Sequence, residues 1–116
     1  MAGSLTVDIL NGYDVSGGFL GIGQTWQYVT ASRVLGTTYT NTSGKPIQIS
    51  VTLYATANNS SPVVNLLIGG VVSQIGGSYG AHTYCYMSMI IPSGVTYSVT
   101  STGTGGYTLT KWYELR

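Results

Sequence analysis

Charged side chains are the scarcest feature of this sequence. Only 6% of its 116 residues are Asp, Glu, Lys or Arg, against roughly 25% in ordinary globular domains. The four basic residues, Arg33, Lys45, Lys111 and Arg116, are scattered and cannot form the positive stripe that binds nucleic-acid phosphates. With a formal net charge of +1, copies of the chain also repel one another only weakly. We therefore expect no nucleic-acid partner, and we predict a multimer or a component of a particle.

Cysteine and histidine are almost missing, with one residue of each type. A single cysteine, Cys85, excludes a disulfide within the chain, and its position among Tyr and Met residues predicts a buried thiol. A closed zinc site needs more Cys and His ligands than these two residues supply. His82 and Cys85 face opposite sides of a predicted strand, which argues against a nucleophile and base in contact. We expect neither a metal nor a cofactor.

Carboxylates are equally few, because the chain holds only Asp8, Asp14 and Glu114. A hydrolase needs a positioned acid and base, and an enzyme that cleaves polysaccharide normally needs a carboxylate pair. Isolated carboxylates are mostly solvated or paired with a nearby arginine. The glycine-rich "GGFLGIG" (17–23) lacks the Lys-Ser/Thr and the helix of a phosphate loop. We predict no enzymatic activity and assign no catalytic residue.

Long apolar runs are missing as well. No stretch approaches the roughly 20 apolar residues of a membrane-spanning helix, and the N-terminus lacks a basic region followed by an apolar run. We expect no membrane insertion and no secretion signal. The length suits one buried core. We divide the chain into an N-terminal arm or first strand, residues 1–20, and a β-sandwich domain, residues 21–116.

The apolar residues that are present alternate with polar ones. In residues 47–55 every odd position is apolar, the clearest pattern of a half-buried strand. Residues 81–91 and 95–102 alternate in the same way. The pair Gly69-Gly70 predicts a tight hairpin. Residues 37–46, a short strand and a turn, predict a second hairpin onto the strand at 47–55.

The number and spacing of these segments indicate the fold class. Seven or eight short strands are separated by turns rich in Gly, Ser, Pro and Asn, and no window shows a helical period. This pattern is typical of a single antiparallel β-sandwich or jelly roll. The connectivity of the strands is left open.

Tyrosine, in contrast, is abundant, with ten residues. Tyr54, Tyr84 and Tyr86 fall on the polar side of their strands, where a flat ring with a hydroxyl suits a protein interface or a sugar. They are our candidates for surface recognition; the alternative is cross-strand pairing that only stabilises the sheet. We interpret Trp26 and Trp112 as interface or core anchors. Arg33 is expected to lie beside Trp26.

Three stretches resemble a known family. They are "GxGQTWQxVTASRxLGTTYTNTSGKPI" (21–47), "PSGVTYSV" (92–99) and "WYELR" (112–116). Together they look like a β domain of bacteriophage virion proteins that is often found at the C-terminal tip of tail fibres. The resemblance spans roughly residues 21 to 116. It implies a compact β-sandwich that commonly forms a homotrimer on the outside of the particle.

The resemblance also implies a function. We expect a virion structural protein at the virion surface, made in the host cytoplasm, most simply a receptor-binding tail-fibre tip. Its partners would be its own copies, other virion proteins and a host-surface glycan or protein. Only the short arm 1–20 precedes the domain, in place of a long shaft, so a capsid decoration (cement) protein is the alternative. A stand-alone lectin-like carbohydrate-binding module is a further alternative.

Overall fold

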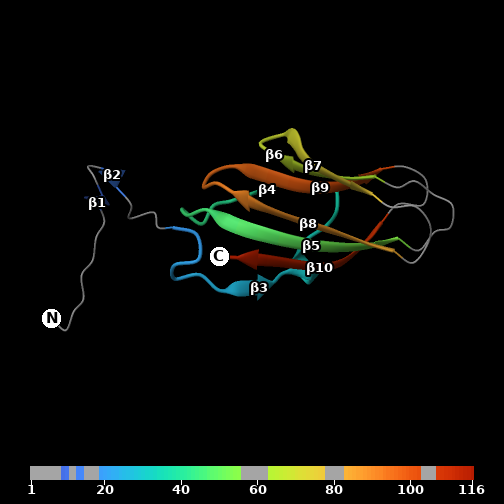
Figure 1. Ribbon diagram of the computed structural model, residues 1–116, viewed down its shortest axis with the longest axis horizontal. Coiled ribbons are helices and arrows are strands. Elements are labelled where there is room, and N and C mark those ends of the chain that lie inside the picture. The colour runs from blue at the N-terminus through green and yellow to red at the C-terminus, as the bar shows by residue number, and fades with distance from the viewer. Residues whose placement is uncertain (1–8, 11–12, 15–18, 56–62, 78–82, 103–106) are drawn as a thin grey trace.

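The computed structural model describes residues 9–10, 13–14, 19–55, 63–77, 83–102 and 107–116. Within them, eight strands form two antiparallel four-stranded sheets that pack face to face (Figure 1). Sheet I has the order β3 (Trp26–Tyr28), β10 (Thr108–Leu115), β5 (Ile47–Ala55), β8 (Thr83–Ile91). Sheet II has the order β4 (Tyr39–Thr40), β9 (Thr96–Thr102), β6 (Val63–Ile68), β7 (Val71–Gly77). The predicted antiparallel β-sandwich is confirmed.

The remaining elements are small. β1 (Ile9–Leu10) pairs with β2 (Tyr13–Asp14) in a separate two-stranded sheet. A single turn of 3-10 helix, η1 (Thr30–Ser32), follows β3, and the described residues contain no α-helix. No helix in this part of the chain is long and apolar enough to cross a membrane.

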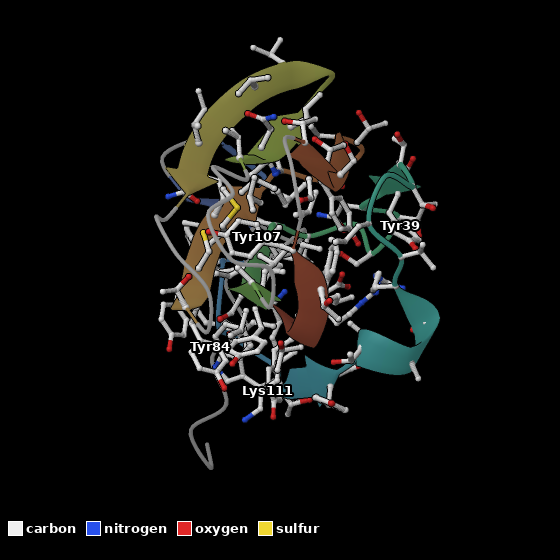
Figure 2. The ribbon with its side chains drawn as sticks, turned by 90° about the vertical axis from the view of Figure 1, so that its right-hand side faces the viewer. Tyr39, Tyr84, Tyr107 and Lys111 are labelled. Carbon is white, nitrogen blue, oxygen red and sulfur yellow. The ribbon has the colours of Figure 1, made fainter. Side chains whose placement is uncertain are left out.

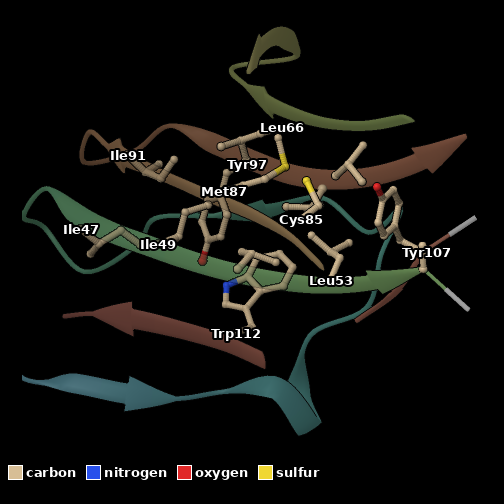
Figure 3. Close-up of a cluster of buried hydrophobic side chains, with 14 residues drawn as sticks. Ile47, Ile49, Leu53, Leu66, Cys85, Met87, Ile91, Tyr97, Tyr107 and Trp112 are labelled. Carbon is tan, nitrogen blue, oxygen red and sulfur yellow. The ribbon is translucent and has the colours of Figure 1, made fainter. Parts of the chain in front are cut away.

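Alternation along the strands builds the core between the sheets. All five odd-numbered residues of β5 are buried, and the residues between them are partly exposed, as a strand with one core face requires. β8 and β9 bury Cys85, Met87, Tyr97 and Val99 from the two sides. Figure 3 shows Cys85, Met87 and Tyr97 in the buried cluster that also contains Trp112, which is fully buried. The inward faces predicted for these strands are confirmed, and of the two roles left open for Trp112, interface or core, the structure places it in the core.

The predicted hairpin at Gly69-Gly70 is also confirmed. It joins β6 to β7, and both glycines have positive φ, 62° and 80°. A two-residue hairpin turn of this type requires φ above zero at both central positions, which glycine adopts without steric cost.

The second predicted hairpin is wrong. β4 pairs with β9 in sheet II, whereas β5 lies in sheet I between β10 and β8. The turn at 41–46 exists, but it carries the chain from one sheet to the other. The buried Asn41 holds it, because its amide donates to the carbonyls of Lys45 (2.7 Å) and Ile91 (3.0 Å). β5 takes a long partner on each side, so no edge is left for the two-residue β4.

The two ends of the sandwich differ. At one end residues 19–25 meet the last residue, since Thr25 and Arg116 exchange backbone hydrogen bonds of 3.2 and 3.1 Å. The tight turns that join β6 to β7 and β8 to β9 lie at this end too (Figure 1). At the opposite end β5, β7 and β9 finish and β6, β8 and β10 begin.

Candidate functional site

The outward-facing side of sheet I is the candidate recognition surface. The pairing of β3, β10, β5 and β8 places alternate residues of all four strands on it. We call this surface the outer face. Its residues are Trp26, Tyr28, Gln48, Ser50, Thr52, Tyr54, Tyr84, Tyr86, Ser88, Ile90, Thr108, Lys111, Tyr113 and Leu115. Figure 2 shows Tyr84 and Lys111 on the same side of the sandwich.

The three tyrosines predicted for recognition lie together on the outer face. Tyr54 is directly opposite Tyr84 across β5 and β8, and their ring centroids are 4.8 Å apart. Tyr86 follows two residues after Tyr84, and these two rings are nearly parallel at 6.1 Å. Tyr84 is 52% exposed and Tyr86 is 72% exposed. The predicted outward placement is confirmed, and cross-strand pairing and ring exposure occur together.

A second aromatic group occupies the other half of the outer face. Tyr28 and Tyr113 pair across β3 and β10 with ring centroids 5.0 Å apart, and Tyr28 is 58% exposed. Sequence reasoning missed this pair. The available signal was the alternation of β10, in which residues 111, 113 and 115 share a face opposite to the buried Trp112.

Trp26 belongs to this second group of aromatic residues. It is opposite Leu115 and remains 50% exposed, so it is not a core residue of the single chain. The reason is that β3 is a three-residue edge strand whose side chains are all exposed. Alternation cannot be read over so short a strand. Trp26 as an interface anchor stays a prediction.

The outer face has little charge. Lys111 is its only charged residue. Glu114 is the only carboxylate side chain in residues 19–116, and it is fully buried. The polar groups of the outer face are therefore mainly hydroxyls and the Gln48 amide, which donates to Ser88 at 3.0 Å. Flat aromatic rings beside hydroxyls on a rigid sheet can contact either a sugar or a protein surface.

A buried polar cluster lies on the opposite side of β10. The Glu114 carboxylate accepts five hydrogen bonds there. The donors are Arg33 Nε (3.0 Å) and Nη2 (2.9 Å), Arg116 Nη1 (2.8 Å), the Tyr97 hydroxyl (2.9 Å) and the Trp112 indole (3.0 Å). The Arg33 guanidinium also lies over the Tyr39 ring, 4.6 Å from its centroid. The cluster thus joins both sheets to the segment that follows β3.

These contacts control the ionisation of the cluster. Burial raises the pKa of Glu114, but the hydrogen bonds and charge of Arg33, with Tyr97 and Arg116, outweigh it and hold the pKa below its ordinary value. Burial and the Glu114 carboxylate together raise the pKa of Tyr97 to about 12. Burial lowers the pKa of Arg33, and its bonds to Glu114 more than compensate, so the guanidinium stays charged. The cluster is an ionised carboxylate saturated with donors.

This geometry assigns Glu114 a structural role. Its carboxylate is inaccessible to solvent and its oxygens are fully engaged, so it is not placed to transfer a proton to a substrate. From the sequence, we expect an isolated carboxylate to be either solvated or paired with an arginine. Glu114 is paired with Arg33. Arg33 lies beside Glu114, between the sheets, while Trp26 points to the outer face. The expected neighbourhood of Arg33 and Trp26 is therefore wrong.

The remaining candidates for reactive chemistry are Cys85, His82, Asp8 and Asp14. Cys85 is a free, buried cysteine, as predicted, and burial raises the pKa of its thiol. His82 and Asp8 lie outside the described residues, and the side chain of Asp14 does as well. In the part of the chain that the structure describes, no group of three or more His, Cys, Asp or Glu residues could hold a metal ion.

No family model matches the chain, and no curated protein matches it. The resemblance to a phage surface domain therefore rests on the three motifs at 21–47, 92–99 and 112–116.

Proposed function

We propose that this chain is a bacteriophage virion structural protein exposed on the particle, and that it is a receptor-binding domain of the tail-fibre-tip type. The virion assignment rests on the resemblance of the three sequence motifs. The outer face of sheet I is the observation that supports a recognition role. A homotrimer is the expected oligomeric state.

The outer face suits recognition for physical reasons. Tyr28, Tyr84 and Tyr86 expose more than half of their surface on a sheet whose core side is fully packed. A tyrosine ring held in this way loses little conformational entropy on binding and offers both an apolar face and a hydroxyl. The near absence of charge removes the desolvation cost of ionic groups. A host-surface glycan or protein is the matching ligand.

The polarity of the sandwich also supports this proposal. Residues 19–25 enter the sandwich at the end where Arg116 lies, through the backbone pairing of Thr25 and Arg116. The opposite end, where β5, β7 and β9 finish, is free of this connection (Figure 1). A tip domain needs this arrangement, because one end faces the particle and the other faces the host.

Labelling of intact virions tests the proposal. Gold-conjugated antibodies against the purified chain are bound to phage particles made by the genome that encodes it, and the particles are imaged by electron microscopy. Label at the fibre tips is the expected result. Label over the capsid would favour the decoration protein instead. The control is the same preparation after denaturation, in which the antibody should react with the protein. If it does so while intact particles carry no label, the protein is not exposed on the particle surface.

A carbohydrate-binding module is the second candidate, and the group Tyr54, Tyr84 and Tyr86 favours it. Binding of the purified chain to immobilised host-surface polysaccharide, measured by surface plasmon resonance, would support glycan recognition. Binding to polysaccharide without any label on virions would favour the stand-alone module over the tip domain.

A further inference from the structure

The two flanks of the sandwich end in very different edge strands. On one flank the edges are β3, with three residues, and β4, with two. On the other flank the edges are β7, with seven residues, and β8, with nine. Figure 2 shows Tyr39 of β4 and Tyr84 of β8 on opposite flanks. Short edges are one way in which proteins avoid edge-to-edge pairing, and the β7/β8 flank lacks this protection.

The β7/β8 flank also lacks two other common protections, charged residues and proline. Neither strand contains a charged residue or a proline. Among the described residues, six of the eleven exposed large hydrophobic residues lie on these two strands: Val71, Val72, Ile75, Tyr84, Tyr86 and Ile90. A β-bulge interrupts β7 opposite Leu66 and Leu67, which leaves Gln74–Gly77 as its regular part. A long uncharged edge that pairs with no strand among the described residues is complementary to one kind of partner, another extended strand.

The positions of β7 and β8 define how two such flanks fit together. Within one chain the two strands run in opposite directions, and Gly76 is level with Cys85, since a Cβ at Gly76 would be 2.6 Å from the Cys85 Sγ. Rotation of a second copy about an axis parallel to the strands places its β8 beside β7 of the first. The two strands are then antiparallel, and Ile75 is level with the neighbour's Tyr86.

We propose that the β7/β8 flank is the interface between copies of this chain, with β7 of each copy pairing antiparallel with β8 of the next in a closed ring. Sheet II of one copy then continues into sheet I of its neighbour. Ile75, 68% exposed, and Tyr86, 72% exposed, become cross-strand neighbours on the outward side. Every long edge of the ring is paired, so no edge remains for open polymerisation.

The choice of an axis parallel to the strands rests on the proposed function. Such an axis puts residues 19–25 of all copies at the same end of the ring, where they can join one particle. Pairing of β7 with β7 about an axis perpendicular to the strands would place them at opposite ends.

An edge-blocking variant tests the interface. Ile75→Lys adds a charge to the β7 edge at an exposed position, so the fold of each copy should be unaffected. Val34→Lys is the matched control, because Val34 is 60% exposed and lies outside the strands. In light scattering at micromolar concentration, we expect Ile75→Lys to fall to the single-chain mass, while wild type and Val34→Lys remain multimers. A monomeric wild type, or an Ile75→Lys variant as large as the control, overturns the proposal.

Cysteine cross-linking tests the pairing and its direction. Adjacent antiparallel strands place opposite Cα atoms roughly 5 Å apart, within the reach of a disulfide. In a Cys85→Ser background, the double variant Ile75→Cys/Tyr86→Cys should give a covalent ladder on a non-reducing gel that ends at the number of copies in the ring. Ile75→Cys alone should give no cross-link. A dimer from the single variant would indicate β7-to-β7 pairing and overturn the proposal, as would an absent or open-ended ladder.

These results are independent of the virion assignment. The mass and the ladder are measured on the purified chain, so they can fail while antibody label on particles still supports a virion protein. A ladder that ends at two would keep the interface and contradict the homotrimer. Absence of label on virions would contradict the proposed function and leave the interface intact.

Discussion

Replacement of Glu114 by glutamine is the sharpest test of how this sandwich is held together. Glutamine keeps the size of the side chain but removes the charge and one acceptor oxygen. The five donors around Glu114 then face a neutral amide whose own N–H groups point at them, and Arg33 is left in a site where it is only 12% exposed. Removal of one partner of a buried ion pair costs roughly 3–5 kcal/mol.

The loss should be easy to measure. A domain of this size has a net stability of roughly 5–15 kcal/mol, so a loss of roughly 3–5 kcal/mol in Glu114→Gln should remove about a fifth or more of the free energy of unfolding. Urea unfolding at pH 7, followed by the fluorescence of the tryptophans, gives the free energy directly. Lys111→Gln, an exposed change on the same strand, is the control and should shift stability by about 0.5 kcal/mol or less. A Glu114→Gln variant within about 1 kcal/mol of wild type would refute the assigned role.

The pH dependence gives a second readout of the same change. The pKa of Glu114 in the folded chain lies below its ordinary value of 4.5. Its contribution is therefore fully present above about pH 4.5 and is lost as the pH falls through the lower folded pKa. Wild type should lose more stability than Glu114→Gln between pH 7 and pH 3, while Asp8 and Asp14 affect both chains equally. Parallel curves of stability against pH would contradict this account.

Other substitutions test the remaining features. Tyr28→Ala should weaken binding of the fluorescently labelled chain to host cells about tenfold without a change in melting temperature, because its ring is 58% exposed and lies on β3, away from the β7/β8 flank; unchanged binding would remove it from the recognition surface. Gly76→Ala should cost roughly 1–3 kcal/mol in urea unfolding, since the new methyl meets the Cys85 Sγ at 2.6 Å, and Cys85→Ala should restore part of this loss. Trp112→Ala should lower the free energy of unfolding by roughly 3–5 kcal/mol, because Trp112 is fully buried. Trp26→Ala should lower it much less, because Trp26 is half exposed. Equal melting temperatures for the two variants would contradict this difference.

Local features of this protein can be predicted from the sequence because they depend on neighbours a few residues apart. The odd-numbered core residues of β5 and the outward direction of Tyr84 and Tyr86 follow from a period of two, which is a property of any strand. The hairpin at Gly69-Gly70 follows from the freedom of glycine at positive φ.

Pairings between distant segments were decided by the tertiary structure. Arg33 and Glu114 are 81 residues apart, and no local pattern indicates that η1 and β10 bring them together in a buried cluster. The same holds for β4, whose partner is β9 because β5 already has long strands on both sides. Trp26 is exposed because β3 is an edge strand, and the strand order is set by which apolar faces pack best together. The packing of these faces depends on residues from the whole chain, so no single stretch of the sequence predicts it.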